Sequence, residues 1–284
     1  MASSFGLNTK ISKNVLKKVK SRYILKRIMK NVEMLKSFEI IRYNKKMQND
    51  LNIDIDDFKK HSMIKIEIIP AENKYGKFIN INNNKDKSHY HIYFDDNTEE
   101  NKICDIDEKM KVKKITVKID YQINSFGELF DNCDCISSVY FKIFNRDNIT
   151  NMNSMFARCT SLKEINFSNF ITDNVTDMGL MFYECTSLKE INLLDFNTDN
   201  VKDMFHMFSG CSSLKELNLS KFNTNKVKDM RNMFAGCSSL KEINLSNFTF
   251  NNKTYQNKMF SGCSEELKLK IKAQYQNIRN EAFD

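Results

Sequence analysis

The chain has 284 residues, of which 41% are hydrophobic and 28% are charged. That composition can bury a core and excludes wholesale disorder, and the lack of any apolar run of roughly 18 residues argues against a membrane-spanning helix. The formal net charge of +8 is unevenly spread, because residues 1–60 carry 15 Lys/Arg against 6 Asp/Glu, while residues 61–122 carry 11 of each.

Residues 1–60 are predicted to form a basic helical module. Between Ser12 and Leu51 the apolar residues recur at intervals of three and four, which indicates two or three helices. The candidate basic docking residues are Lys13, Lys17, Lys18, Lys20 and Lys26. A lysine-rich face of this kind has three interpretations. It is simply solvated, it docks an acidic partner protein, or it binds nucleic acid or an anionic membrane surface. Nucleic acid is not expected, since the chain has no zinc-finger or aromatic RNA-binding signature.

Part of this module, residues 23–51, resembles an F-box helical motif. The resemblance is carried by the apolar residues Ile28, Met29, Leu35, Phe38 and Ile41, and the leading Leu-Pro of that family is absent. The resemblance implies an adaptor role in protein degradation, in which these helices bind a ligase component.

Residues 61–122 alternate apolar and polar side chains, which is typical of strands with one buried face. The alternating runs are Ile64–Ile68, Ile79–Ile81, Tyr90–Phe94 and Ile115–Tyr121. We expect a small sheet that caps the repeats that follow, because a stack of repeats otherwise exposes a strand edge. His89 and His91 point to the same face, and we interpret them as a solvent-facing or hydrogen-bonded pair rather than the start of a metal site.

From about Ile123 the sequence repeats every 26 residues, and two columns of side chains hold that step. The columns are Cys133, Cys159, Cys185, Cys211, Cys237 and Cys263, and Phe130, Phe156, Phe182, Phe208, Phe234 and Phe260. A fixed step of roughly 20 to 50 residues indicates stacked units that bury their apolar faces against one another. We therefore expect a solenoid of six units over residues 123–271, with residues 272–284 as a C-terminal cap.

Each unit is predicted to have a helical half and a strand half. In one unit the apolar residues from Val201 to Leu214 step by three and four, with Asn200 as helix cap and Asp203 in the first turn. Leu217 and Leu219 then alternate as in a strand. The expected fold class is an α/β solenoid of the leucine-rich-repeat type, and Leu269 and Ile271 are expected in its final strand.

The cysteine column is interpreted as packing, because free cysteine behaves as a small buried hydrophobe. Cys133 and Cys135, with Cys104 upstream, lack the paired spacing of a zinc site. The lysine-rich start has no apolar secretory core, so we expect reduced thiols in a cytoplasmic protein. No metal or cofactor is expected.

The repeat pattern M-F-x-x-C-x-S-L-K-E-[IL]-N-L-S-x-F resembles the BspA-like leucine-rich repeat family, which occurs in bacterial surface proteins and is expanded in protists. Met181–Phe196 and Met207–Phe222 match it most cleanly, and the resemblance covers residues 123–263. It implies a parallel leucine-rich solenoid used for adhesion or protein binding, without enzymatic activity. Many relatives are surface proteins, a location that this chain would reach only by non-standard export.

Two columns on the strands are the candidate partner-binding residues. They are Glu164, Glu190, Glu216 and Glu242, and Asn166, Asn192, Asn218 and Asn244, with Tyr140 as a departure from the repeat. A preceding lysine column is formed by Lys163, Lys189, Lys215 and Lys241. In one interpretation the lysines neutralise the glutamates and the asparagines form a hydrogen-bonded ladder. In the other, the same face binds a partner protein.

The predicted function is a non-enzymatic protein–protein interaction scaffold that binds through this face and the N-terminal basic helices. The alternatives are a structural subunit of a larger assembly and a surface adhesin of the BspA-like type. No catalytic residue is assigned, since the chain has no phosphate-cradling glycine loop and no nucleophile with a plausible base.

Overall fold

The computed structural model describes residues 49, 62–81, 87–120, 123–144, 147–168, 170–251 and 253–284. The chain divides into two compact units, Met1–Ser62 and Met63–Asp284. The basic helices expected in residues 1–60, with their candidate docking lysines, lie outside the described residues. Within the described ranges no helix has the length and apolar character needed to cross a membrane.

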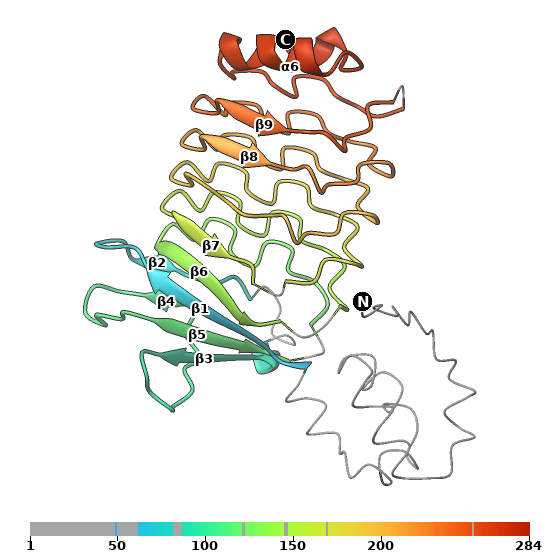
Figure 1. The fold of residues 1–284 in the computed structure, drawn as a ribbon. Coiled ribbons are helices and arrows are strands. Elements are labelled where there is room, and N and C mark those ends of the chain that lie inside the picture. Colours follow the sequence, from blue (N-terminus) through green and yellow to red (C-terminus); the bar gives the residue numbers. More distant parts are fainter. Residues whose placement is uncertain are drawn as a thin grey trace, which may run out of the picture. The chain divides into compact units, whose positions relative to one another are not determined.

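Short strands are the main regular elements of the second unit, and turns and loops make up most of the rest. Its elements are β1 (Ile64–Pro70), β2 (Gly76–Lys77), η1 (Lys87–His89), β3 (Tyr90–Phe94), β4 (Asp105–Ile106), β5 (Ile115–Ile119), β6 (Ile136–Ile143), β7 (Glu164–Asn166), β8 (Glu216–Asn218), β9 (Glu242–Asn244), α6 (Glu265–Gln274) and η2 (Asn280–Ala282). Figure 1 shows β1 to β6 at one end of this unit and α6 at the other.

A five-stranded sheet in the order β3-β5-β1-β6-β7 forms the first part of the unit. Its pairs are antiparallel except β6–β7, which is parallel. The alternation that predicted strands is confirmed in β1, where Ile64, Ile66 and Ile68 are fully buried. The strand expected at Ile79–Ile81 is absent. Because β6 pairs with β1 on one side and β7 on the other, the sheet continues into the repeats without a break.

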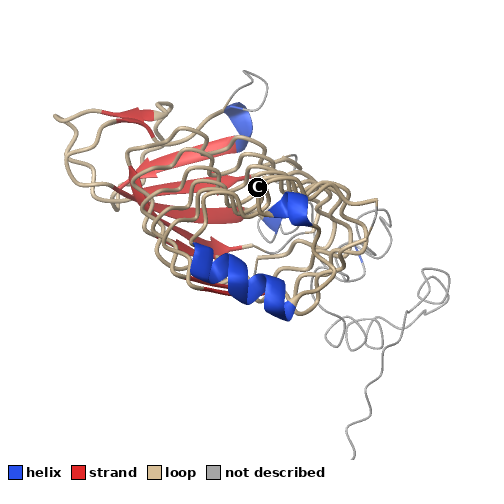
Figure 2. Cartoon of the chain, turned by 90° about the horizontal axis from the view of Figure 1, so that it is seen from above, coloured by secondary structure: helices blue, strands red, loops and turns tan. Residues whose placement is uncertain are grey.

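Beyond Ser125, successive coils of the chain lie side by side in a register of 26 residues. Parallel bridges join Ser125 to Asn151, Asn151 to Asp177, Asp177 to Asp203, Asp203 to Asp229 and Asp229 to Tyr255. The phenylalanine column stacks through the interior, with neighbouring ring centroids 5.1, 5.8, 5.4, 5.8 and 5.3 Å apart. Seen along the stack, the strands gather on one side of the coils (Figure 2).

The expected α/β solenoid of leucine-rich-repeat type is wrong, because the repeats contain no helical half. Among the described residues of Met63–Asp284, α6 is the one α-helix, and the segment from Val201 to Leu214 is a series of overlapping turns. There the amide of Met207 donates to the carbonyl of Met204, three residues back. Left-handed backbone at His206 (φ 54°) and Gly210 (φ 78°) interrupts any helix.

The amides between these turns donate to the next coil instead of to their own. Met204 N–H bonds to Asp229 O at 3.0 Å, His206 N–H to Arg231 O at 3.0 Å, and Phe208 N–H to Met233 O at 2.9 Å. Inward side chains at a spacing of three and four are therefore compatible with turns as well as with a helix. The second unit therefore consists of turns and short strands. The strand pairs are mostly antiparallel in the first sheet and parallel between the coils.

The residues expected to cap that helix have other roles. Asn200 donates its side-chain amide to Asp173 O of the preceding coil at 2.7 Å. The Asp203 carboxylate accepts the amide of Phe205 at 2.8 Å and so closes a tight turn. Burial raises the pKa of the Asp203 carboxyl, and the stacked carboxylates of Asp177 and Asp229 raise it further.

The C-terminal strand expected at Leu269 and Ile271 is also wrong, because these residues lie in α6. The Ser264 hydroxyl accepts the amide of Leu267 at 3.2 Å and caps the helix. Leu267 and Ile271, four residues apart, are buried, whereas Leu269 is 67% exposed. After α6 the chain returns along the last coil, where Phe260 N–H donates to Ala282 O at 2.7 Å and Phe283 stacks on Phe260 at 5.4 Å.

The packing role predicted for the cysteine column is confirmed, and the thiols also make hydrogen bonds. Each thiol donates to a phenylalanine carbonyl of the preceding coil, from Cys159, Cys185, Cys211, Cys237 and Cys263 at 2.9, 3.1, 3.1, 3.1 and 3.2 Å. All are free and buried. Burial raises the pKa of these thiols, for Cys263 to about 11, so they stay protonated at neutral pH.

Native-state alkylation tests the packing of the column. Because the thiolate is the nucleophile, iodoacetamide at pH 8 is expected to modify half-buried Cys104 and to leave Cys159, Cys185 and Cys211 unmodified until the chain is denatured. Mass spectrometry of the digested protein gives the order of modification. Early labelling of Cys185 in the native state would contradict the structure.

Gly210→Ala tests the left-handed turn positions. The substitution is expected to lower the free energy of unfolding by about 1–2 kcal/mol for the φ angle alone, and its Cβ would lie 3.0 Å from Glu184 Cγ and 3.3 Å from Glu184 Cα. Gly236→Ala is the matched control, with φ 73° but no neighbouring atom closer than 3.6 Å. Urea denaturation should show both variants destabilised and Gly210→Ala more so; the reverse order would refute the assignment.

Candidate functional site

The strand side of the coils carries the predicted glutamate and asparagine columns. In β7 and β8 the central residues, Ile165 and Leu217, are buried, at 7% and 3% exposed, and the flanking Glu and Asn are exposed. The register pairs Ser138 with Glu164 and Tyr140 with Asn166, and separately Glu216 with Glu242 and Asn218 with Asn244. The structure therefore brings the predicted residues together in two groups, at β6–β7 and at β8–β9.

The asparagine column does not form the expected ladder from coil to coil. Each side-chain oxygen instead accepts a backbone amide two residues further on, with distances of 2.8, 3.1, 3.0 and 3.0 Å for Asn166, Asn192, Asn218 and Asn244. This is the asparagine turn that ends an extended segment and reverses the chain. The asparagine oxygens therefore serve the backbone.

The glutamate column is left available. Within the described ranges, none of Glu164, Glu190, Glu216 and Glu242 forms an ion pair with the preceding lysine column. Glu164 accepts a hydrogen bond of 2.8 Å from the Tyr140 hydroxyl, which raises the pKa of the Tyr140 phenol. Lys142 lies over the Tyr140 ring at 5.0 Å. On α6, Lys268 pairs with Glu265 and Lys270 pairs with Glu266.

The ladder is interrupted between these two groups, at the coil that carries Glu190 and Asn192. On either side, backbone bonds join Lys163 to Ser137 at 2.8 Å and Lys215 to Lys189 at 3.3 Å. In the part of the chain that the structure describes, no corresponding bond joins Lys189 to Lys163, and Glu190–Asn192 is not a strand. The extended segments of two adjacent coils thus face each other without backbone pairing.

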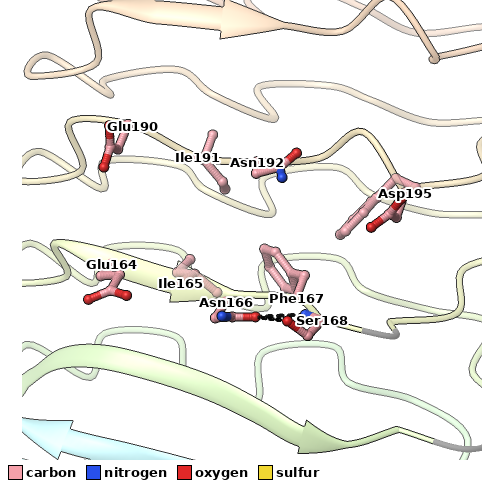
Figure 3. A pocket seen from close by; sticks show the side chains of 10 residues that line it. Glu164, Ile165, Asn166, Phe167, Ser168, Glu190, Ile191, Asn192 and Asp195 are labelled. Atoms are coloured by element: carbon pink, nitrogen blue, oxygen red, sulfur yellow. Dashed lines mark hydrogen bonds between the residues drawn. The ribbon is translucent and has the colours of Figure 1, made fainter.

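A cavity of about 410 Å³ lies at this interruption. Its lining residues are Glu164, Ile165, Asn166, Phe167, Ser168, Glu190, Ile191, Asn192, Asp195 and Phe196. Figure 3 shows Glu164 to Ser168 along one coil facing Glu190 to Asp195 along the next. We call this cavity the strand-side cleft. It combines three carboxylates, from Glu164, Glu190 and Asp195, with apolar side chains.

A bulky ring lies beneath the cleft. Phe167 occupies the position that Leu193, Leu219 and Leu245 hold in later units. Its ring centroid is 4.9 Å from that of Phe170 and 5.0 Å from that of Phe196. Phe141 holds the same position in the preceding coil and stacks on Phe167 at 5.5 Å, so this interior column changes from phenylalanine to leucine at the interruption.

Comparison with known proteins places the chain in a family. A family model described as "Mycoplasma protein of unknown function, DUF285" matches residues 101–213 and again residues 150–273, which together span more than half of the chain. The chain belongs to the DUF285 family.

The matches agree with the resemblance to BspA-like repeat proteins at a coarse level and give no support to the F-box resemblance of residues 23–51. No curated protein and no solved structure matches the chain.

His89, His91 and the buried free cysteines of this DUF285 chain have partners other than a metal ion in the part of the chain that the structure describes. His91 lies 3.3 Å from Glu100 and 3.4 Å from Asp120, so the histidine pair has acidic partners that its sequence surroundings did not reveal. The Cys135 thiol donates to Lys77 O at 3.1 Å, and burial raises its pKa to about 12. Among the described residues, no group of three or more His, Cys, Asp and Glu side chains is arranged to hold a metal ion.

Of the residues that line the cleft, the sequence predicted Glu164, Asn166, Glu190 and Asn192 as binding residues, and it did not predict Ser168, Asp195 or the apolar Ile165, Phe167, Ile191 and Phe196. Phe167 left a visible signal, since it is a phenylalanine in a column that is otherwise leucine from Leu193 onward. Asp195 left none, because its position in the repeat is occupied by unrelated residues.

A pair of substitutions in β8 separates structural from available residues in the DUF285 chain. Asn218→Ala removes the acceptor of the Ser220 amide and is expected to cost about 0.5–1.5 kcal/mol of stability. Glu216→Ala, two residues away on the same exposed face, is expected to change stability by less than about 0.5 kcal/mol. Urea denaturation gives both values. Equal costs would mean that the glutamate column is also part of the framework.

Proposed function

We propose that the chain is a non-enzymatic binding module whose protein partner occupies the strand-side cleft. The observation that carries the proposal is the interruption of the ladder between β7 and Glu190–Asn192, where exposed carboxylates and unpaired backbone groups lie around one cavity. Backbone donors and acceptors that are not used within a sheet are common points of attachment for an extended peptide.

The chemistry of the cleft indicates what the partner presents. Glu164, Glu190 and Asp195 favour Lys or Arg on the partner, and the carboxylates lie on both sides of the apolar Ile191. A fitting segment is therefore extended, with a basic residue next to an apolar one. Such a pairing gives specificity through charge and affinity through apolar burial.

The state of the thiols argues against a catalytic cysteine in this column. A catalytic cysteine needs a lowered pKa and access to solvent. The column from Cys159 to Cys263 has the opposite properties, with buried thiols whose pKa values are raised by burial.

Photo-crosslinking in the native cell tests the proposal. A photoreactive residue at Asn192, in the cleft, is expected to capture a defined protein, and the same residue at exposed Leu269 on α6 is the control. Recovery of the same proteins from both positions, or of none at Asn192, would overturn the proposal. Capture only within one insoluble assembly would favour the structural-subunit alternative.

Charge reversal identifies the side chains that recognise the partner. Glu164→Lys with Glu190→Lys is expected to abolish capture at Asn192, because both carboxylates line the cleft. Glu72→Lys with Glu108→Lys, two exposed residues outside the cleft, makes the same change in net charge and should leave capture intact. Thermal unfolding of both variants shows whether the fold is retained.

A further inference from the structure

A second groove lies away from the strand-side cleft, at the corner where the coils return from the strands. It is lined by Lys202, Asn225, Lys226, Val227, Lys228, Asn251 and Lys253, and has a volume of about 640 Å³. Four of these residues, Lys202, Lys226, Lys228 and Lys253, are exposed lysines. We call this groove, with its four lysines, the basic groove.

Lys202 and Lys228 hold equivalent positions on successive coils, whereas Lys226 lies two residues before Lys228 and Lys253 lies on the next coil in the column of Val227. Lys228 N–H donates to Lys202 O at 2.8 Å, and Tyr255 N–H donates to Lys228 O at 2.9 Å. Paired extended segments lie about 4.8 Å apart, so like charges are held close together. Such an arrangement costs free energy unless an anion offsets it.

The structure supplies no carboxylate for these ammonium groups. Among the described residues none of the four lysines forms an ion pair, and Lys226 Nζ donates to the neutral side-chain oxygen of Asn200 at 2.8 Å. In the earlier coils the corresponding corner carries Asp173 and Asp199, and the next residue in that column is Asn225. The acidic side chain is therefore lost in the same coil in which Lys226 appears.

The positive charge of the groove does not reflect a high net charge of the rest of the chain. Residues 1–60 hold 15 of the 44 Lys/Arg and 6 of the 36 Asp/Glu, which leaves 29 basic and 30 acidic residues in the rest of the chain. Four unpaired lysines around one groove are thus a local concentration of positive charge on a nearly neutral unit.

We propose that the basic groove binds an extended, carboxylate-rich segment of a partner protein. Three coils span about 10 Å, which corresponds to about three residues of extended chain at about 3.3 Å each. Nucleic acid is a poorer fit, because none of the described lining residues is aromatic and base stacking needs aromatic rings. This site is distinct from the strand-side cleft in its residues and in the charge of its ligand.

Zero-length crosslinking locates the site on the full chain. The probe is an N-acetylated peptide of six glutamates, whose carboxylates a carbodiimide joins to nearby lysines. Mass spectrometry is expected to find the peptide on the basic groove more often than on the exposed control lysines Lys109, Lys111, Lys113 and Lys221. Uniform labelling of all exposed lysines, or no labelling of the groove, would overturn the proposal.

Binding of the labelled peptide to matched variants measures the contribution of the groove. Replacing its four lysines by Gln should weaken binding about tenfold, which corresponds to about 0.35 kcal/mol for each exposed charge pair. Replacing the four control lysines by Gln should weaken peptide binding less than about twofold, because these lysines lie outside the groove and their charges are screened by salt. The N-terminal lysines are unchanged in both variants and so affect both equally.

An oligothymidylate of equal charge distinguishes the two kinds of anion. If the groove variant loses more affinity for this oligonucleotide than for the peptide, the groove binds nucleic acid and the proposal is wrong. Unchanged peptide binding in a groove variant that still unfolds at the temperature of the wild type would also refute it. A loss confined to the peptide supports the proposal and leaves the strand-side cleft untested.

Discussion

Hydrogen bonds between successive coils are the constraint on which the rest of the structure depends. Phe156, Phe182, Phe208 and Phe234 each donate their amide to a methionine carbonyl of the next coil at 2.9 Å. This bond fixes each residue over its counterpart 26 positions away. Each side chain then lies next to the equivalent side chain of the neighbouring coil. Phenylalanine rings stack nearly parallel, and each cysteine thiol donates to a phenylalanine carbonyl of the preceding coil.

The period and the inward residues could be predicted from the sequence, because they follow from which side chains are apolar. The conformation of the chain between them could not. Apolar residues at intervals of three and four fit a helix, and they equally fit turns whose amides bond to the next coil. Left-handed backbone at Leu180 and His206 has no sequence signal, since neither is glycine. Ser264 followed by Leu267 and Ile271 did signal the C-terminal helix, but the alternation of Leu269 and Ile271 concealed it.

The strand face was predicted as a set of uniform columns, and its uniformity proved to be only partial. The asparagines accept hydrogen bonds within their own turns, whereas among the described glutamates of the column only Glu164 is engaged, by the Tyr140 hydroxyl, and the sequence alone does not distinguish the two columns. The cleft lies where the repeat changes from Phe167 to Leu193, a departure that is visible in the sequence. The loss of backbone pairing at this point was not predictable, because pairing depends on how the whole packed interior adjusts.

The end of the stack has a consequence for assembly. A seventh coil would normally accept the amides of the sixth, but the tail takes its place: Lys258 N–H donates to Glu281 O and Phe260 N–H to Ala282 O, both at 2.7 Å. The C-terminal tail therefore pairs with the backbone of the last coil as a further repeat would. It occupies backbone amides at the edge that another copy of the chain could otherwise pair with. Polymerisation of this unit through that end is disfavoured, and lengthening the array would require new repeats to be inserted before Ser264.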